Sequence, residues 1–162
     1  MTQLEIMGAN AKNASVFLRT AGSKKDDALL AIAKALREHS DEIIKANEID
    51  IENGKNAGLT ESLLDRLRLT PERINGMAEG VEQVAALADP IGNVLEGRTL
   101  KNGLNIEKVR VPMGVIGIIF EARPNVTFDV FSLCFRSGNV CVLKGGSDAD
   151  FSNRALVPFR RL

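Results

Sequence analysis

Two short apolar runs separated by one helix-length segment constrain the fold of this 162-residue chain more than any other feature. The first run, residues 115–120, is rich in β-branched side chains, and the second, residues 140–143, is equally apolar. Such runs are typical of strands in a parallel sheet, because both faces of these strands are covered. Residues 126–136 have the apolar spacing of a helix and lead into a Ser–Gly–Asn turn. The pattern predicts a βαβ unit and therefore an α/β fold.

The region before Pro90 is predicted to be helical. Apolar side chains recur there at helical spacing in four segments, approximately residues 4–18, 23–36, 40–53 and 70–85. Ser23, Ser40 and Thr70 are the expected capping residues, and Thr70 is followed by a proline that suits the first helical position. The Asn53–Gly54 pair is the expected end of the third helix.

Turn residues become frequent after Pro90. Asn102–Gly103 lies between residues 94–101 and 104–111, and this dipeptide predicts a hairpin because both positions tolerate positive φ. The second apolar run is followed by a Lys–Gly–Gly–Ser–Asp turn, after which residues 149–156 can start another helix.

Composition excludes several classes of function. The chain has 21 basic and 21 acidic side chains and lacks Trp and Tyr, so we expect no nucleic-acid partner. No signal peptide or membrane-spanning run is present, which favours a cytoplasmic protein without a membrane partner. Only Cys134, Cys141 and His39 offer soft metal ligands, so we expect neither a zinc site nor a disulfide scaffold.

The loops after the two predicted strands are where a ligand is expected, because ligands of open α/β sheets bind at the carboxyl ends of the strands. The first loop holds Arg123 and Asn125 just before a helix, and the second holds Lys144, two glycines and Ser147. Together they predict a site for an anionic ligand. From spacing alone an alternative is equally supported, in which Asn125 or Thr127 only caps a helix and the glycines only turn the chain.

Residues 111–149, with the sequence VPMGVIGIIFEARPNVTFDVFSLCFRSGNVCVLKGGSDA, resemble the γ-glutamyl phosphate reductases (glutamate-5-semialdehyde dehydrogenases) of proline biosynthesis. Residues 11–15, 58–74 and 87–92 extend this resemblance upstream. The family is a branch of the aldehyde dehydrogenase superfamily, so the resemblance implies an aldehyde-dehydrogenase-like cofactor-binding domain with a Rossmann-like βαβ unit. It also implies NADPH-dependent reduction of L-glutamate 5-phosphate to L-glutamate 5-semialdehyde, and it is compatible with a homo-oligomer in the intact enzyme.

The resemblance assigns roles to individual residues. Asn125 matches the amide that donates to the oxyanion of the tetrahedral intermediate in the superfamily. Lys144 matches the lysine that contacts the adenosine ribose or its 2′-phosphate, and Ser147 and Asp148 flank the same pocket. Arg123 is proposed on chemical grounds as the anchor of a substrate carboxylate or of the acyl phosphate. The alternative for Arg123 is a structural salt bridge with the nearby Glu121.

The sequence departs from the family in two respects. The nucleophilic cysteine of the family lies far downstream in a separate catalytic domain, and neither Cys134 nor Cys141 matches it. Residues 158–162 form an atypical tail where family sequences continue as a helix. We therefore expect a truncated cofactor-binding domain, with a helical segment at 1–90 and the hairpin and βαβ part at 91–157. Such a chain is expected to be inactive alone; the alternatives are a non-catalytic NADP(H)-binding fragment and a subunit-interaction module.

Overall fold

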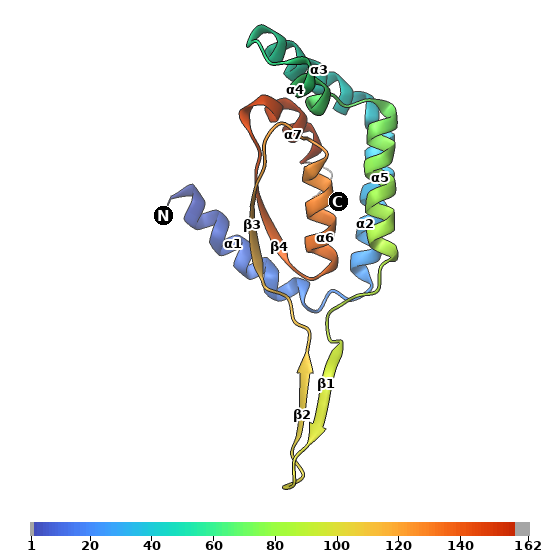
Figure 1. Cartoon of the computed structure of the whole chain (residues 1–162), viewed down its shortest axis with the longest axis vertical. Helices are drawn as coiled ribbons and strands as arrows, with labels where there is room; N and C mark the ends of the chain where they lie inside the picture. The colour runs from blue at the N-terminus through green and yellow to red at the C-terminus, as the bar shows by residue number, and fades with distance from the viewer. Residues whose placement is uncertain (1, 158–162) are drawn as a thin grey trace.

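A computed structural model describes residues 2–157 of the chain, and the predicted atypical tail at 158–162 lies outside the described residues. Within them the chain forms an α/β fold of seven helices, one 3₁₀ turn and two separate two-stranded sheets (Figure 1). None of the helices described combines the length and the apolar character needed to cross a membrane. The elements are α1 (Gln3–Leu18), α2 (Lys24–Glu38), α3 (Ser40–Asn56), α4 (Glu61–Leu67), α5 (Pro71–Ala86), β1 (Val94–Thr99), β2 (Asn105–Val109), β3 (Val115–Ile119), α6 (Val126–Arg136), β4 (Val140–Lys144), η1 (Ser147–Ala149) and α7 (Asp150–Leu156).

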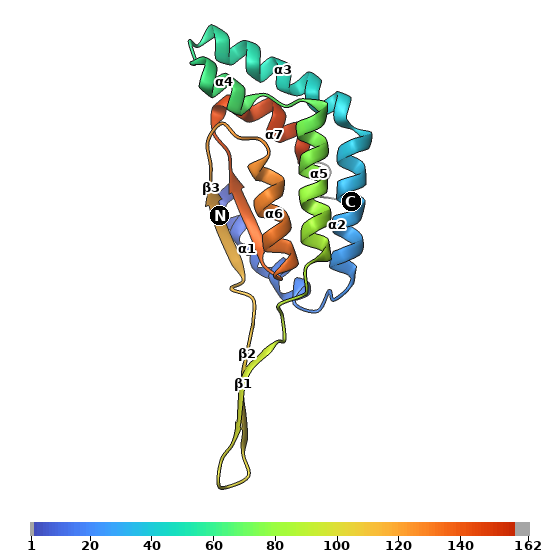
Figure 2. The ribbon, with the colours of Figure 1, turned by 45° about the vertical axis from the view of Figure 1, so that its right-hand side comes forward.

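The main apolar core lies among the helices. Helices α2 and α5 pack side by side along their lengths, and α6 lies between this pair and strand β4 (Figure 2). Helix α7 packs against α3, above the carboxyl ends of β3 and β4 in the view of Figure 1. This arrangement buries the apolar faces that the helical spacing predicted for α2, α3 and α5. The face predicted for α1 is buried only in its second half, since Leu4 is 76% and Met7 41% exposed. The core residues are Leu29, Ile32, Ala33, Ala35, Leu36, Ile43, Leu69, Ile74, Met77, Ala78, Val81, Ala85, Phe128 and Leu156.

Strands β3 and β4 pair in parallel around the crossover helix α6, which confirms the predicted βαβ unit. The expectation that the first strand is covered on both faces is wrong for the described part of the chain. Val115 is 41% exposed and Ile119 is 85% exposed, whereas Ile116 and Ile118 are half-buried. The reason is that α1 and α6 pack mainly against β4, so β3 is an edge strand with one open face.

The hairpin of β1 and β2 projects away from the rest of the molecule (Figures 1 and 2). Its strands pair antiparallel, and every residue in both of them is exposed. The prediction of a turn at Asn102–Gly103 is confirmed. Of these two residues only Gly103 takes a positive φ, of 85°.

The four predicted helices are present, but one of the predicted ends is wrong and one helix was not predicted. Helix α3 continues past the Asn53–Gly54 pair to Asn56. Gly54 is needed for packing rather than for termination, since a Cβ atom there would lie 2.9 Å from Leu59 Cδ1. Helix α4 begins two residues after Leu59, and the apolar spacing of this short segment did not predict it.

Only one of the three predicted side-chain caps is observed. The Thr70 hydroxyl accepts a hydrogen bond from the backbone N–H of Arg73 at 3.2 Å, as predicted. Ser23 makes no such bond, and Ser40 is already the first residue of α3. The buried Ser40 Oγ has no hydrogen-bond partner within the described residues. Only His39 separates α2 from α3, so His39 itself is the N-cap residue of α3. Ser40 is already helical and cannot take the extended backbone conformation of a capping residue.

Candidate functional site

The loops that follow β3 and β4 lie together at one end of the parallel pair. The Phe120 N–H donates to the Lys144 carbonyl at 3.1 Å, which extends the pairing by one residue. One residue further on, a Cβ atom at Gly146 would lie 3.4 Å from the Cα atom of Glu121. The two loops therefore lie side by side.

The loop after β3 and the start of α6 line a cavity of about 390 Å³. Arg123 and Asn125 both line it, together with Asp129 of α6. Its remaining wall comes from the end of α4, the α4–α5 corner and the first half of α5. A cavity of this volume accommodates a ligand of amino-acid size. The residues of this second wall are Asp65, Arg66, Arg68, Leu69, Arg73, Gly76 and Met77.

Asn125 immediately precedes α6 but does not cap it with its side chain. Instead, its Nδ2 donates to Asp129 Oδ2 at 3.0 Å, within the cavity wall. The Thr127 hydroxyl donates to Asn153 Oδ1 at 3.0 Å and so ties the start of α6 to α7. The alternative in which either side chain only caps the helix is therefore wrong. The Asn125 amide carries two N–H groups, so the bond to Asp129 leaves one for a ligand.

Partial burial in the cavity wall raises the pKa of the Asp129 carboxyl from its ordinary value of 3.8. The hydrogen bond from Asn125 acts in the opposite direction, and its effect on this pKa is the smaller of the two.

Two side chains fix the α4–α5 corner that forms the second wall. Asn47 of α3 is buried; its amide donates to the Leu67 carbonyl at 2.8 Å and accepts from the Leu69 N–H at 2.7 Å. The Arg73 guanidinium donates to the carbonyls of Asp65 and Arg68 and to the Asp65 carboxylate, the last at 2.9 Å. Arg73 is therefore occupied in holding the corner, and its charge is paired with that of Asp65.

Two other arginines of the cavity carry unpaired charges. Throughout residues 2–157, no hydrogen bond or ion pair engages the guanidinium of Arg66 or of Arg123. The predicted alternative of a salt bridge between Arg123 and Glu121 is therefore wrong. Arg68 has only a 3.9 Å contact with the exposed Glu61. Four arginines against two carboxylates make the cavity electropositive, and the N-terminus of α6 adds its partial positive charge.

The second predicted group of site residues lies outside this cavity. Lys144 is the last residue of β4, and its ammonium donates to the Gly145 carbonyl at 2.8 Å. Ser147 and Asp148 are exposed at the start of η1. Packing explains Gly145, because a Cβ atom there would lie 2.5 Å from Asn153 Nδ2. The structure therefore brings Arg123 and Asn125 to one cavity, and it places Lys144, Ser147 and Asp148 on the neighbouring loop.

Cys134 does not have the properties of a nucleophile. Neither thiol forms a disulfide within the described residues, and Cys134 is buried in α6. Burial raises the pKa of the Cys134 thiol above its ordinary value of 9.0, although a hydrogen bond with Cys141 opposes the shift. A thiol with a raised pKa is mostly protonated at neutral pH and therefore weakly reactive. Within the described residues, no group of three metal-ligating side chains is close enough to hold a metal ion.

The sequence patterns do not single out Arg66, Arg68, Arg73 or Asp129. The one local signal was the alternation of arginine and leucine over residues 66–69, since Leu67 and Leu69 are buried while Arg66 and Arg68 are exposed. Nothing in this spacing indicates that the corner faces the loop after β3, because that contact depends on Asn47, some 20 residues away in the chain.

Comparison with known proteins first defines a class. No protein-family model matches the chain. A crystal structure of a putative aldehyde dehydrogenase from Bacillus subtilis superimposes on 98% of the chain with a TM-score of 0.70 at 18% identity, which shows a shared fold. The chain thus has the α/β fold of an aldehyde dehydrogenase domain.

Closer relatives then define the family. Crystal structures of γ-glutamyl phosphate reductases from Thermotoga maritima and Saccharomyces cerevisiae match 99% of the chain, with TM-scores of 0.96 and 0.94 at 43% and 35% identity. The γ-glutamyl phosphate reductase of Cutibacterium acnes is 53% identical over 148 residues, which are 91% of this chain and 36% of that protein. That of Pasteurella multocida is 48% identical over 157 residues, 96% of this chain and 37% of that protein. The chain is therefore homologous to the N-terminal part of the γ-glutamyl phosphate reductases and spans a little over a third of their length.

Proposed function

We propose that this chain contributes the substrate cavity and part of the cofactor site to a cytoplasmic, NADPH-dependent reductase of L-glutamate 5-phosphate in proline biosynthesis. The observation that carries the proposal is the electropositive cavity beside Asn125, in a chain homologous to γ-glutamyl phosphate reductases. Such a cavity suits an acyl phosphate whose carbonyl oxygen lies next to the amide of Asn125.

Asn125 has the role of oxyanion donor. Attack of a thiolate on the acyl carbon places negative charge on the carbonyl oxygen, and the free N–H of Asn125 stabilises that charge. The hydrogen bond to Asp129 holds the amide in the cavity wall at 3.0 Å. Since Cys134 is buried with a raised pKa, we do not assign the thiolate to this part of the chain. Loss of one such donor typically slows the chemical step by about 10²–10³-fold.

Arg123 has the role of phosphate anchor. It lies two residues before Asn125 and lines the same cavity, and its guanidinium has no partner within the described part of the chain. Its planar fork of donors matches two phosphate oxygens and would hold the leaving group beside the acyl carbon.

Lys144, Ser147 and Asp148 fit the adenosine end of NADPH. The exposed Lys144 ammonium can exchange its bond to the Gly145 carbonyl for a charge-assisted bond to a 2′-phosphate, and the exposed hydroxyl and carboxylate suit a ribose. The two glycines do not form an open cradle, since Asn153 and Glu121 occupy the space beside them. NADPH, when bound, supplies the hydride.

Titration of the chain with NADPH and with NADH tests the cofactor assignment. We expect Lys144→Ala to weaken NADPH binding by about tenfold and to leave NADH binding within about twofold, because only NADPH carries the 2′-phosphate. Lys101→Ala, at the tip of the hairpin, is the matched control. Equal losses for both cofactors would contradict the assignment.

Binding of a phosphonate analogue of L-glutamate 5-phosphate tests the substrate assignment. We expect the analogue to shift the side-chain amide resonances of Asn125, and Arg123→Ala to weaken its binding by about tenfold or more. Arg19→Ala, on an exposed position after α1, is the control. Binding that is unaffected by loss of Arg123 would contradict the proposed anchor.

A further inference from the structure

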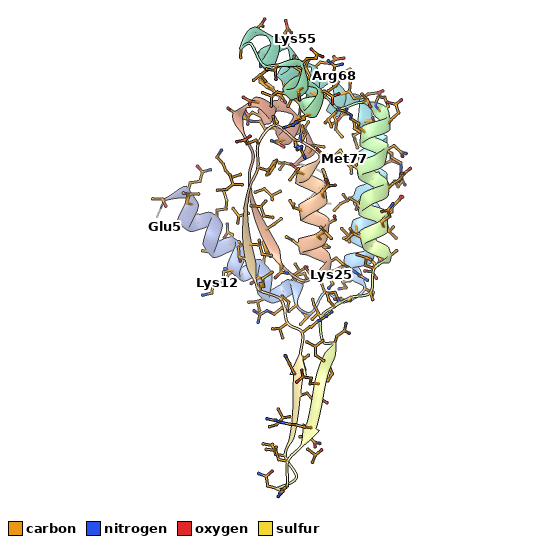
Figure 3. The ribbon with its side chains drawn as sticks, in the orientation of Figure 1. Glu5, Lys12, Lys25, Lys55, Arg68 and Met77 are labelled. Atoms are coloured by element: carbon orange, nitrogen blue, oxygen red, sulfur yellow. The ribbon has the colours of Figure 1, made fainter. Side chains whose placement is uncertain are left out.

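The cavity contains more positive charge than one anionic group requires. Arg123 belongs to the loop after β3, whereas Arg66 and Arg68 belong to the α4–α5 corner, so the unpaired and weakly paired cations come from two separate walls. Arg68 is labelled at that corner in Figure 3, and Met77 of the cavity wall is labelled on the neighbouring α5. Like charges around one cavity repel each other unless a ligand compensates them.

The corner is built to hold these cations in place. Leu67 and Leu69 are buried on either side of Arg68, and Asn47 fixes the backbone at both leucines with bonds of 2.8 Å and 2.7 Å. Arg73 closes the corner from α5 by bonding to the Arg68 carbonyl at 2.8 Å. The backbone that carries these cations is therefore already ordered, and only side-chain freedom is lost when they bind an anion.

The acids of the cavity do not neutralise this corner. Asp65 is paired with Arg73 at 2.9 Å, and Asp129 accepts its hydrogen bond from Asn125. Glu61 approaches Arg68 only at 3.9 Å and is exposed, so that pair contributes little. Arg66 has no partner within residues 2–157. The corner therefore offers one free and one weakly paired guanidinium to a ligand.

We infer that Arg66 and Arg68 form a second anion subsite that binds the α-carboxylate of the substrate. This inference rests on the proposed function, which places the acyl carbon beside Asn125 and the phosphate on Arg123. The α-carboxylate is then at the opposite end of the substrate, and the corner of α4 and α5 is the wall with free positive charge. The subsite selects acyl phosphates that carry a second, distal anionic group.

The test measures by calorimetry how tightly two ligands bind to the unmodified chain and to its variants. One is the phosphonate analogue of L-glutamate 5-phosphate, and the other is the same phosphonate without the α-carboxylate. Arg66→Ala and Arg68→Ala are expected to weaken the first ligand by about tenfold each and to leave the second within about twofold. Arg66→Gln serves as a second variant that removes the charge but keeps a polar side chain larger than that of alanine, and Arg19→Ala is the exposed control.

Each outcome separates the inference from the proposed function. The subsite is overturned if Arg66→Ala and Arg66→Gln weaken the binding of both ligands equally, or if they weaken the binding of neither. In either case Arg123→Ala still tests the phosphate anchor independently. Failure of both ligands to bind the unmodified, folded chain overturns the proposed function and the subsite together. Partial rescue by Arg66→Lys, which keeps the charge and loses the fork, would support the subsite.

Discussion

Asp129 has an unusual electrostatic position for an acid in the first turn of a helix. The positive N-terminal end of a helix normally stabilises a carboxylate, and Asn125 adds a hydrogen bond at 3.0 Å. The pKa of Asp129 is nevertheless raised, because partial burial in the cavity wall outweighs the hydrogen bond. Perturbed carboxyl groups of this kind cluster at functional sites, which agrees with a role for Asp129 in orienting Asn125.

The raised pKa predicts a small gain in stability when Asp129 is replaced by Asn. The folded state binds the proton of this carboxyl more tightly than the unfolded state does, so the charged form costs stability at neutral pH. Asp129→Asn removes the charge and keeps an oxygen that accepts from Asn125. We expect Tm at pH 7 to rise by about 1–2 °C, and the gain to disappear below about pH 3, where both states are protonated.

Thermal unfolding at several pH values, followed by circular dichroism, measures this difference. Asp41→Asn is the matched control, because Asp41 is an exposed acid in the first turn of α3. That variant is expected to lower Tm at pH 7, since it only removes a favourable interaction with the helix dipole. A loss of stability in Asp129→Asn at pH 7 would contradict the predicted cost of the charge.

At the scale of the elements, Gly138 allows the tight turn that joins α6 to β4. It has a φ of 71°, and a Cβ atom there would lie 2.3 Å from Ile91 Cδ1 and 2.9 Å from Pro112 Cγ. We expect Gly138→Ala to lower the free energy of unfolding by about 2–4 kcal/mol, from left-handed strain and overpacking together.

Gly80→Ala in the interior of α5 is the opposite case. No atom lies within 4 Å of its added Cβ, so we expect a gain of about 0.5–1 kcal/mol from the higher helix propensity of alanine. Urea denaturation of both variants measures the two changes. A Gly138→Ala variant as stable as the unmodified chain would contradict the predicted strain and overpacking.

The elements that could be predicted from the sequence are those whose signals are local. The βαβ unit, the hairpin turn and the start of α5 at Thr70 depend on apolar runs, a dipeptide and a Thr–Pro pair, and the structure contains all three. The end of α3 depends instead on Gly58, which has a φ of 78°, and on the Leu59 N–H, which donates to the Gly54 carbonyl at 3.0 Å. Helix α4 has only seven residues, too few to show a clear helical period. Gly54 and Gly58 are both local signals for a helix end; the helix ends at the second, and Gly54 packs against Leu59.

The same division holds for the candidate site. Arg123 and Asn125 could be singled out because the carboxyl end of a parallel strand is a known position for ligands. Arg66 and Arg68 reach the cavity only because Asn47 of α3 holds residues 67–69 at the corner. No spacing within residues 61–73 indicates that contact.

At the scale of the whole molecule, the β1–β2 hairpin and the rest of the described chain, here called the body, differ in how much of their surface is buried. The body has a buried core shared by α2, α5, α6 and α7, whereas both strands of the hairpin are exposed along their whole length. The hairpin is joined to the body at a narrow base, where the Gly92 and Arg110 N–H groups donate to the Arg110 and Asn93 carbonyls, each at 3.0 Å. Burial, which supplies most of the stability of a fold, is therefore confined to the body.

This arrangement predicts that the body folds without the hairpin. Val94 and Val109 face each other in the register, so residues 95–108 can be replaced by Asn–Gly, a dipeptide that closes a two-residue turn. We expect Tm to change by less than about 2 °C, because no buried side chain is removed and the connection becomes shorter. Thermal unfolding followed by circular dichroism is the measurement, with Asn102→Ala in the intact hairpin as the control. Loss of cooperative unfolding in the shortened chain would mean that the hairpin supports the core, contrary to the exposure of all its strand residues.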